Sequence, residues 1–589
     1  MTARRRKLVV VGNGMAGARV VEEILKRTPD RFDIVMFGAE PYGNYNRILL
    51  SNVLNGTQTA TEIFMNPLAW YRDNGIRLHA GVKAMRIDRE HQVVIGQPLA
   101  KDALAYSADA STEADAQAVD EPYDDLIIAT GSRPFVPPME GFGGPGTFLF
   151  RTIDDCARIA DCAKGKRRAA VIGGGLLGLE AARGLLTHGV EVTVLEAAPQ
   201  LMIAQLDAEA GDMLRKTIEA MGIRVLCNAI TTRIARLDAR RGGPLDGRIT
   251  HLELADGSTL DADMVVVSAG IRPIVEIATA SGLTVNKGIV CDDQMRTSDH
   301  SIFAVGECIE HRGQLYGLVD PIWEQAGVLA DVVTGVRPTS AYHGSRVGTK
   351  LKVMGVELAS MGVTKPADAD DEVVVYREPR NGVYKKLIVR DNRLAGAIVL
   401  GDPDLVPSLI QAFAEGTPLA DRRSDAILPA VARRAPGPVP AADIPDDTRI
   451  CDCNAVTKAR IVEAVLAGAG KGAAAVTTTK VVDAGGGGRG GWLRWVVGAA
   501  ALIAVLALAL TQCGGGDDGA TTTDTSATGS SGAGSGGSTA TTDDGGATTE
   551  ATEKATTTAS TEATTATTEA TTTSILIFGR KLTAYSAPR

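Results

Sequence analysis

Short apolar runs that end in glycine-rich turns dominate the pattern of the N-terminal half of the chain. The run Lys7–Val11 leads into the turn Gly12–Gly17, and the run Ala169–Ile172 leads into the turn Gly173–Gly178. After the first turn, apolar residues recur at helical spacing through Val20, Val21, Ile24 and Leu25. A short apolar run bounded by glycine is typical of a buried strand. The pattern therefore predicts two units in which a strand passes through a turn into a helix.

Each unit is followed by a second predicted strand and an acidic side chain. The strand Asp33–Phe37 precedes Glu40 by three positions, and the strand Glu191–Leu195 ends directly at Glu196. In proteins whose glycine-rich turn binds a dinucleotide, a carboxylate in this place accepts hydrogen bonds from the ribose 2′-hydroxyl of NADH and repels the 2′-phosphate of NADPH. Glu196 therefore favours NADH over NADPH, and the alternative is a solvated glutamate at a strand end.

The spacing of the glycines indicates what the two turns bind. Backbone N–H groups and a helix N-terminus at such a turn favour the pyrophosphate of a dinucleotide. One turn of this kind is weak evidence, because similar turns also join strands to helices without a ligand. Two in one chain predict two bound dinucleotides and electron transfer between them. The candidate contacts are Gly12, Gly14 and Gly17 in the first turn, and Gly173, Gly175 and Gly178 in the second.

Two further segments resemble a known family of flavoproteins. The segment Leu126–Pro134 contains the small-residue turn Thr130-Gly131, and the segment Thr297–Glu307 ends in Gly306-Glu307. Both are similar to segments of the FAD- and NAD-dependent pyridine nucleotide–disulphide oxidoreductases. The resemblance implies that both pairs, together with the first glycine turn, contact FAD. Glu307 stands where most members of that family have aspartate.

The stretch Pro41–Gly56 narrows the resemblance. Disulphide reductases of the family carry two cysteines on the helix that faces the flavin, and this stretch has none, so thiol–disulphide exchange is disfavoured. The stretch resembles the flavoprotein part of assimilatory NAD(P)H nitrite reductases and their rubredoxin reductase relatives. That resemblance implies that Arg47 and Ser51 contact FAD, and a guanidinium suits a pyrophosphate. A surface role is the alternative for Arg47.

The resemblance extends from about residue 5 to 470 but ends in an incomplete motif. Cys451 and Cys453 resemble the opening of a small [2Fe–2S] domain, which needs four thiolates. Cys513 is the only later cysteine, beyond an unrelated apolar run, so a [2Fe–2S] cluster within one chain is doubtful. The sirohaem and [4Fe–4S] half of a nitrite reductase is also missing, and this chain alone is not expected to reduce nitrite.

The expected function is an FAD-dependent oxidoreductase that takes hydride from NADH. The resemblance implies an electron-acceptor partner, which is a nitrite reductase catalytic chain, a rubredoxin or a ferredoxin. Because the cofactors carry the chemistry of hydride transfer, no catalytic side chain is singled out. The alternative from another class is a membrane-tethered, nucleotide-binding redox sensor with little turnover.

These landmarks predict an α/β fold with two Rossmann-like domains, one inserted in the other, and a small α+β domain. The FAD-binding domain is expected at 1–148 and 262–336, with the NAD-binding domain at 149–261 between its two parts. The small domain is expected at 340–430, where residues Val373–Tyr376 and Lys385–Val389 read as strands. The truncated [2Fe–2S]-like segment covers 448–470.

The last fifth of the chain has a different composition. No charged residue occurs between Trp495 and Gly516, and residues 492–513 are therefore expected to form a transmembrane helix. Residues 514–574 are rich in threonine, glycine and alanine, and are expected to be disordered. The abrupt change near residue 470 is compatible with a real fusion or with an artefact of the gene model.

Charge and composition bear on location and partners. The formal net charge of −9 argues against nucleic acid as a partner. Arg489 and Arg494 precede the apolar stretch, and Asp517 and Asp518 follow it. This asymmetry predicts catalytic domains in the cytoplasm of a bacterial cell, and a C-terminal tail outside.

Overall fold

The computed structural model describes most of the first 428 residues and short pieces of the remainder. The described residues are 4–100, 117–237, 247–346, 348–353, 355–428, 445–447, 449–451, 456–460, 462–463, 572–577 and 580–585. The chain divides into two compact units, Met1–Gly437 and Pro438–Arg589. The predicted membrane span 492–513 lies outside the described residues, as do Cys453 and residues 514–571 of the predicted tail.

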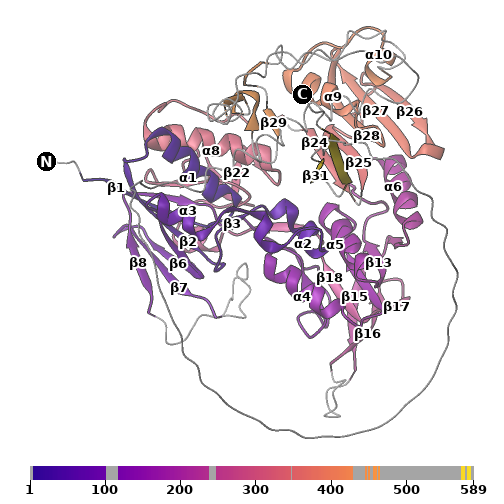
Figure 1. The fold of residues 1–589 in the computed structure, drawn as a ribbon, viewed down its shortest axis with the longest axis horizontal. Helices are drawn as coiled ribbons and strands as arrows, with labels where there is room; N and C mark the ends of the chain where they lie inside the picture. Colours follow the sequence, from indigo (N-terminus) through magenta and orange to yellow (C-terminus); the bar gives the residue numbers. More distant parts are fainter. Residues whose placement is uncertain are drawn as a thin grey trace, which may run out of the picture. The chain divides into compact units, whose positions relative to one another are not determined.

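The first sheet of unit 1 is a five-stranded parallel sheet in the order β21-β9-β1-β2-β5. Figure 1 labels two of its strands, β1 and β2. Its central strands are buried on both faces, which is typical of a parallel sheet covered by helices. Leu8 of β1 pairs with Ile34 on one side and Asp125 on the other. The strands are β1 (Arg6–Val11), β2 (Phe32–Gly38), β5 (Arg77–Ala80), β9 (Asp125–Ile128) and β21 (Ile302–Ala304).

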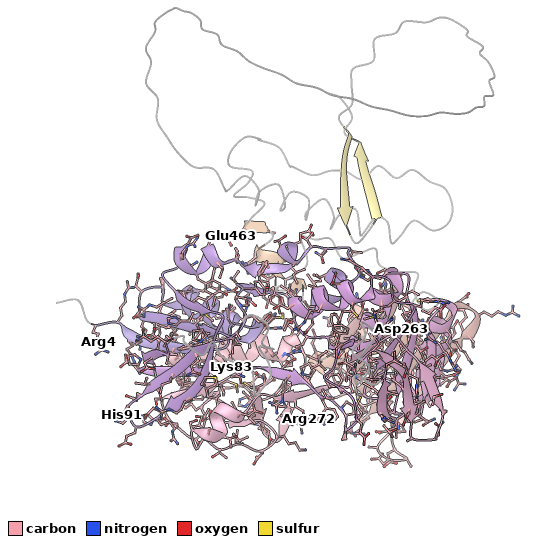
Figure 2. All side chains as sticks on the ribbon, turned by 90° about the horizontal axis from the view of Figure 1, so that it is seen from below. Arg4, Lys83, His91, Asp263, Arg272 and Glu463 are labelled. Carbon is pink, nitrogen blue, oxygen red and sulfur yellow. The ribbon has the colours of Figure 1, made fainter. Side chains whose placement is uncertain are left out.

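A second five-stranded parallel sheet has the order β11-β18-β12-β13-β14. Its strands are β11 (Thr147–Leu149), β12 (Arg168–Ile172), β13 (Glu191–Glu196), β14 (Arg224–Cys227) and β18 (Met264–Val267). The first sheet is thus completed by a strand that follows the second, and the α/β class with two Rossmann-like sheets is confirmed. Figure 2 labels Lys83 in the part that holds the first sheet and Asp263 in the part that holds the second.

The second sheet extends beyond the predicted limits of 149–261. Its edge strand β11 begins at Thr147, and β18 begins at Met264 and pairs with β12. The sequence did not assign β18 to this sheet, because an apolar run such as Met264–Val267 suits the interior of either parallel sheet.

Helices cover both sheets and follow the predicted glycine turns. Helix α1 begins within the first glycine turn, after Gly14, and α5 begins within the second, after Gly175. Helix α8 packs beside α1. The helices of this part are α1 (Met15–Arg27), α2 (Leu50–Leu54), α3 (Leu68–Asp73), α4 (Ile153–Ala163), α5 (Leu176–Thr187), α6 (Ala208–Ala220), α7 (Glu276–Ala280) and α8 (Val319–Thr334), with short 3₁₀ turns η1 (Arg47–Leu49) and η2 (Ala60–Ile63).

Short antiparallel sheets flank the two parallel ones. Glu121 lies in β8, where its carboxylate pairs with Lys7. The strands are β6 (Val82–Asp88), β7 (Val93–Pro98) and β8 (Val119–Pro122); β15 (Thr231–Arg236), β16 (Ile249–Leu254) and β17 (Thr259–Asp261); β22 (Ile309–His311) and β23 (Gln314–Leu315), with β20 (Ile289–Cys291) parallel to β22; β3 (Asn44–Tyr45) and β4 (Phe64–Asn66); and β10 (Ser132–Pro134) and β19 (Ile271–Pro273).

The small domain is an antiparallel sheet in the order β24-β25-β28-β27-β26, with α9 packed on it. The two predicted strands Val373–Tyr376 and Lys385–Val389 are present, and Gly382 in the turn between them has a φ of +66°. The elements are β24 (Gly348–Val353), β25 (Val356–Gly362), β26 (Glu372–Glu378), η4 (Pro379–Asn381), β27 (Val383–Arg390), β28 (Arg393–Leu400), α9 (Val406–Glu415) and α10 (Ser424–Ile427).

Unit 2 is described in short pieces. It contains the strand pair β29 (Arg449–Cys451) and β30 (Val456–Thr457), and the pair β31 (Thr572–Ile577) and β32 (Arg580–Tyr585). Within the residues that the structure describes, no helix combines the length and the hydropathy needed to span a membrane.

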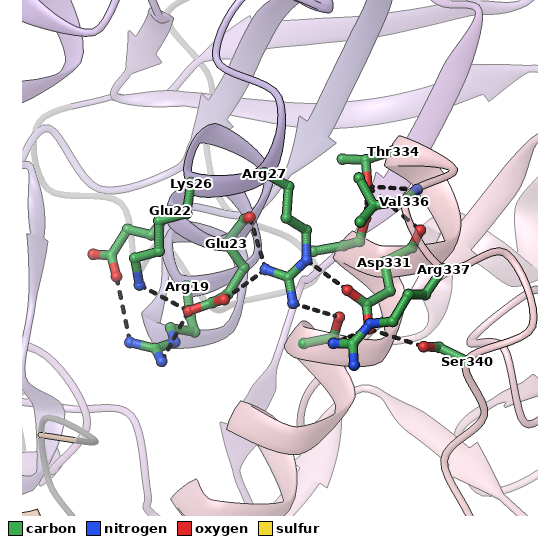
Figure 3. A network of polar contacts seen from close by, with 12 residues as sticks. Arg19, Glu22, Glu23, Lys26, Arg27, Asp331, Thr334, Val336, Arg337 and Ser340 are labelled. Carbon is green, nitrogen blue, oxygen red and sulfur yellow. Dashed lines mark hydrogen bonds and ion pairs between the residues drawn. The ribbon is translucent and has the colours of Figure 1, made fainter. Parts of the chain in front are cut away.

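An ion-pair network joins α1 to α8 (Figure 3). Arg27 donates from Nε to Asp331 Oδ1 at 2.6 Å and from Nη1 to Glu23 Oε2 at 2.6 Å. Arg19 pairs with the other oxygen of Glu23 at 2.9 Å, and Arg337 pairs with Asp331 at 2.7 Å. Burial alone would raise the pKa of Glu23, but its cationic neighbours lower it to about 2. The network fixes the two helices to each other.

We expect this network to make the stability of the protein depend on pH. The pKa of Glu23 lies below its ordinary value of 4.5, so its contribution is complete above about pH 4.5 and is lost as the pH falls towards 2. Glu23→Gln should lower the free energy of unfolding at pH 7 by roughly 2–3 kcal/mol. The same substitution should have a clearly smaller effect at pH 3, where part of this contribution has already been lost.

Denaturant unfolding at pH 7 and at pH 3 measures the effect. Glu219→Gln is the matched control, because it breaks an i,i+4 pair with Arg215 at a more exposed place on α6. An equal loss of stability for Glu23→Gln at both pH values would contradict the assignment.

Candidate functional site

The first glycine turn has a geometry that requires two of its glycines. Gly12 has a φ of +116°, and a Cβ there would lie 2.2 Å from the carbonyl oxygen of Ala129. A Cβ at Gly17 would lie 2.1 Å from the carbonyl oxygen of Gly12. Gly14 differs, because no atom lies within 4 Å of the place that its Cβ would take. The turn is therefore packed tightly on the sheet but leaves open space at Gly14.

Helix α1 begins at this open space with its backbone N–H groups available. Gly14 is the N-cap and makes no side-chain cap hydrogen bond, and the first turn of the helix has no acidic residue. By contrast, Thr152 caps α4 and Asp207 caps α6 with their side chains. Uncapped N–H groups at a helix N-terminus bind anions.

A cavity of about 280 Å³ lies in front of this turn. Seven of the predicted FAD-site residues line it: Gly12, Gly14, Glu40, Arg47, Thr130, Gly131 and Glu307. A second cavity of about 230 Å³ shares four lining residues with the first, among them Gly12 and Thr130, and extends to Val82–Met85. The two cavities together run along the carboxyl ends of the first sheet, where ligands of α/β proteins bind.

A cation and a carboxylate stand side by side in the first cavity. Arg47 forms an ion pair with Glu40, and Tyr45 donates its hydroxyl to the other oxygen of Glu40 at 2.6 Å. Burial would lower the pKa of Arg47, but Glu40 and its other neighbours raise it. The guanidinium therefore stays charged and is suited to a pyrophosphate.

A second charged group is built around Glu307. Its Oε2 accepts hydrogen bonds from Arg151 at 2.5 Å and from Ser132 Oγ at 2.7 Å. Burial would raise the pKa of Glu307, but Arg151 and Ser132 lower it, so it stays a carboxylate. Thr130 donates its hydroxyl to the carbonyl oxygen of Ile274 at 2.7 Å, which ties the Thr130-Gly131 turn to the neighbouring segment.

The site fits a large, polar and anionic ligand such as FAD. The open Cβ position of Gly14, the uncapped helix and Arg47 provide an anion site, while Glu40 and Glu307 can accept hydrogen bonds from ribose or ribityl hydroxyls. Trp323 also lines the cavity, and its buried indole Nε1 finds no hydrogen-bond partner among the described residues. A buried donor without a partner is consistent with a polar ligand there.

The second glycine turn repeats the geometry of the first. Gly173 also has a φ of +116°, and a Cβ there would lie 2.3 Å from the carbonyl oxygen of Ser268. A Cβ at Gly178 would lie 2.0 Å from the carbonyl oxygen of Gly173, while the Cβ position of Gly175 is open. Helix α5 likewise starts at Gly175 without a side-chain cap.

Glu196 lies at the end of β13, beside this second turn. Its Oε2 accepts a hydrogen bond from the backbone N–H of Gly174 at 2.6 Å, and its Oε1 accepts one from Ala198 at 2.8 Å. These bonds hold the carboxylate next to the turn. The structure thus brings Glu196 and the second set of glycines together.

Three of the predicted FAD-site residues do not line the first cavity, and several residues that line it were not predicted. Gly17, Ser51 and Gly306 are not among the residues that line the cavity. Among those that do, the sequence did not single out Asn13, Tyr42, Tyr45, Ser132, Arg151 and Trp323. Tyr42 and Tyr45 lie within the stretch compared with the family, whereas Arg151 carries no local signal because its partner Glu307 is 156 residues away.

The cysteines of the described part form neither a redox pair nor a metal site. Cys156, Cys162, Cys227, Cys291 and Cys308 are free. In the described ranges, no group of three or more His, Cys, Asp or Glu side chains could hold a metal ion. Cys451 lies in β29, and its predicted companion Cys453 falls outside the described residues.

Comparison with protein families gives two matches. Residues 6–328 match the family described as pyridine nucleotide-disulphide oxidoreductase. Residues 348–417 match the rubredoxin NAD⁺ reductase C-terminal domain, which covers the sheet of the small domain and α9.

Curated relatives are redox proteins. The nitrite reductase [NAD(P)H] of Bacillus subtilis is 41% identical over 78% of this chain and 53% of its own length. The assimilatory nitrate reductase electron transfer subunit of the same organism is 38% identical over 78% of this chain and 55% of its own. The rubredoxin-NAD(+) reductase of Pseudomonas putida is 29% identical over 67% of this chain and all of its own. The chain spans about half the length of the first two relatives.

Solved structures share the fold. A ferredoxin reductase from Rhodopseudomonas palustris superposes with a TM-score of 0.57 at 26% identity, over 67% of this chain and 91% of that one. The NADH:rubredoxin oxidoreductase from Clostridium acetobutylicum superposes with a TM-score of 0.56 at 23% identity, over 72% of this chain and 100% of that one.

Proposed function

Because the chain belongs to the pyridine nucleotide-disulphide oxidoreductase family, we propose that it is an FAD-dependent oxidoreductase that takes hydride from NADH and passes electrons to an acceptor. The observation that carries this proposal is the pair of glycine turns, which repeat one geometry on two separate parallel sheets. Each turn leaves one open Cβ position in front of an uncapped helix.

The residues divide between two cofactors. FAD is held by the first turn with Glu40, Arg47, Thr130-Gly131 and Glu307, and it supplies the chemistry that accepts hydride and releases electrons. NADH is held by the second turn, and Glu196 selects it over NADPH. Arg47 and Glu307 keep their charges despite burial, because Arg47 pairs with Glu40 and Glu307 pairs with Arg151.

A dithiol mechanism does not fit the described part of the chain. The stretch that faces the first cavity, 41–56, contains no cysteine. Cys308, which lies next to Glu307, is fully buried, and its sulfur contacts the backbone carbonyls of Val305 and Ile128. Burial raises the pKa of this thiol, which disfavours the reactive thiolate.

The acceptor that we propose is a protein: a nitrite reductase catalytic chain, a rubredoxin or a ferredoxin. Support comes from the relatives, which are named as a nitrite reductase, an electron transfer subunit and a rubredoxin reductase. Cys451 and Cys453 supply only two of the four thiolates that a [2Fe–2S] cluster needs, so we propose that the electrons pass from FAD to the acceptor protein without an internal cluster.

For the C-terminal fifth we propose a membrane anchor at 492–513 and a tail outside the cell, with the catalytic domains in the cytoplasm. The support is the uncharged sequence between Trp495 and Gly516, and the positive charges that precede it. Fractionation of cells that produce the full chain, compared with a chain ended at residue 445, tests the anchor.

Steady-state NADH oxidation tests the activity. The FAD-loaded full chain should reduce ferricyanide rapidly with NADH, and it should reduce at least one acceptor protein of the three classes. NADH binding without appreciable turnover on any acceptor would favour the alternative of a redox sensor.

A further inference from the structure

The loop between Glu196 and Asp207 is built onto the second glycine turn. Glu196 accepts the hydrogen bond from Gly174 at the start of this loop. In the middle of the loop, the backbone N–H of Met202 donates to the carbonyl oxygen of Gly174 at 3.1 Å. A Cβ at Gly174 would lie 2.5 Å from the side chain of Leu201. The loop therefore packs directly on the glycine turn that is proposed to bind NADH.

The far end of the loop is fixed by the small domain. Asp207 caps α6, and its Oδ1 accepts a hydrogen bond from Ala210 N at 3.0 Å. Its Oδ2 accepts hydrogen bonds from Tyr384 Oη at 2.7 Å and Lys386 Nζ at 2.8 Å. Both donors belong to β27, which lies in the sheet of the small domain. One carboxylate thus joins the loop, the helix and the small domain.

This junction is buried within a shared apolar core. Tyr384 is 1% exposed, and it packs in one cluster with Leu201, Met202 and Leu206 of the loop. Burial would raise the pKa of Asp207, but Lys386, Ala210 and Tyr384 lower it. Because Asp207 and Lys386 are both largely withdrawn from water, removal of one leaves the buried charge of the other without its ion-pair partner. The contact is therefore expected to hold the loop in one position.

The strand β27 also carries a second lysine on its opposite face. Successive side chains of a strand point to opposite faces of the sheet. Lys385 accordingly pairs with Asp402 at 2.5 Å and donates to the carbonyl oxygen of Ile427 at 3.2 Å, all within the small domain. Lys385 and Lys386 are thus both largely buried, and each forms an ion pair. They differ in that Lys386 contacts Asp207, the N-cap of α6, whereas the partners of Lys385 lie in the small domain.

We propose that Tyr384 and Lys386 are positioning residues for NADH: through Asp207 they hold the loop that shapes the second dinucleotide site. The inference rests on the proposed function, and it assigns the small domain a role in cofactor affinity. Since neither residue lines the cavity of the first site, loss of the contact should weaken NADH binding and leave hydride transfer within the bound complex unchanged.

Anaerobic rapid mixing of the FAD-loaded full chain with NADH separates binding from transfer. The dependence of the bleaching rate on NADH concentration yields the NADH Kd and a limiting rate. We expect Lys386→Met to raise the Kd about fivefold with the limiting rate unchanged. Tyr384→Phe, which keeps the ring in the core and removes only the hydroxyl, should raise the Kd in the same direction. Lys385→Met is the matched control and should leave the Kd at the wild-type value.

The outcomes separate the two claims. A wild-type Kd for both Lys386→Met and Tyr384→Phe, with normal bleaching, would overturn the positioning role and leave the proposed function intact. An equal rise for Lys385→Met would also overturn it, because the effect would then follow from weakening the small domain in general. If NADH fails to bleach the wild-type protein, the proposed function is wrong and the positioning role falls with it.

Discussion

Gly14→Val is expected to weaken FAD binding by about tenfold to a hundredfold, and Gly175→Val to weaken NADH binding by a similar factor. Both Cβ positions are open in the structure, and both residues have ordinary negative φ angles of −80° and −82°. The side chain therefore costs little in the free protein, but it occupies the space that a pyrophosphate needs at the helix N-terminus.

The two variants should fail in different ways. Gly14→Val should retain its melting temperature before FAD is added and should hold little flavin after gel filtration. Gly175→Val should retain yellow FAD but need far more NADH to bleach it. Gly12→Ala is the control for a fold defect, because its Cβ would collide with Ala129. Normal binding of both cofactors by both valine variants would contradict the assignment of the two turns.

A second large effect is expected for the choice between NADH and NADPH. Glu196→Ser combined with Ala197→Arg removes the carboxylate that repels a 2′-phosphate, and adds a cation at an exposed position next to it. The ratio of kcat/KM for NADH to that for NADPH should fall by about a hundredfold, which corresponds to roughly 2.7 kcal/mol. Steady-state assays with both nucleotides and ferricyanide measure this ratio.

The control for this change lies at the other end of the same strand. Glu191 is exposed at the start of β13, far along the strand from the glycine turn. Glu191→Ser should leave the ratio unchanged, although it removes one negative charge from the same domain. If the double variant at Glu196 and Ala197 kept the wild-type ratio, Glu196 would not determine the choice of nucleotide.

The glycine turns were predictable from sequence because their constraints are local. A strand that turns sharply into a helix needs a positive φ at its first glycine and no Cβ at its third. Gly12 and Gly17 meet these needs within six residues, and Gly173 and Gly178 repeat them. The same reasoning located Glu196, since the length of one helix and one strand fixes its distance from the turn.

Other features depend on pairings between distant parts of the chain. Arg151 lines the first cavity because it pairs with Glu307, and β18 joins the second sheet because it pairs with β12. From the sequence, Asp207 is expected to be an ordinary helix N-cap. The residues to which it is hydrogen-bonded, Tyr384 and Lys386, are more than 170 positions away in the sequence. No local pattern of apolar and polar residues encodes such pairings, so they needed the structure.

The two-cofactor assignment is tested most directly by an anaerobic titration of the FAD-loaded full chain with NADH, followed by absorbance. If both turns bind as we propose, one NADH should bleach one FAD, and the yellow band should return when an electron acceptor is added. A protein that binds FAD but stays oxidised in excess NADH would contradict the transfer of hydride between the two sites.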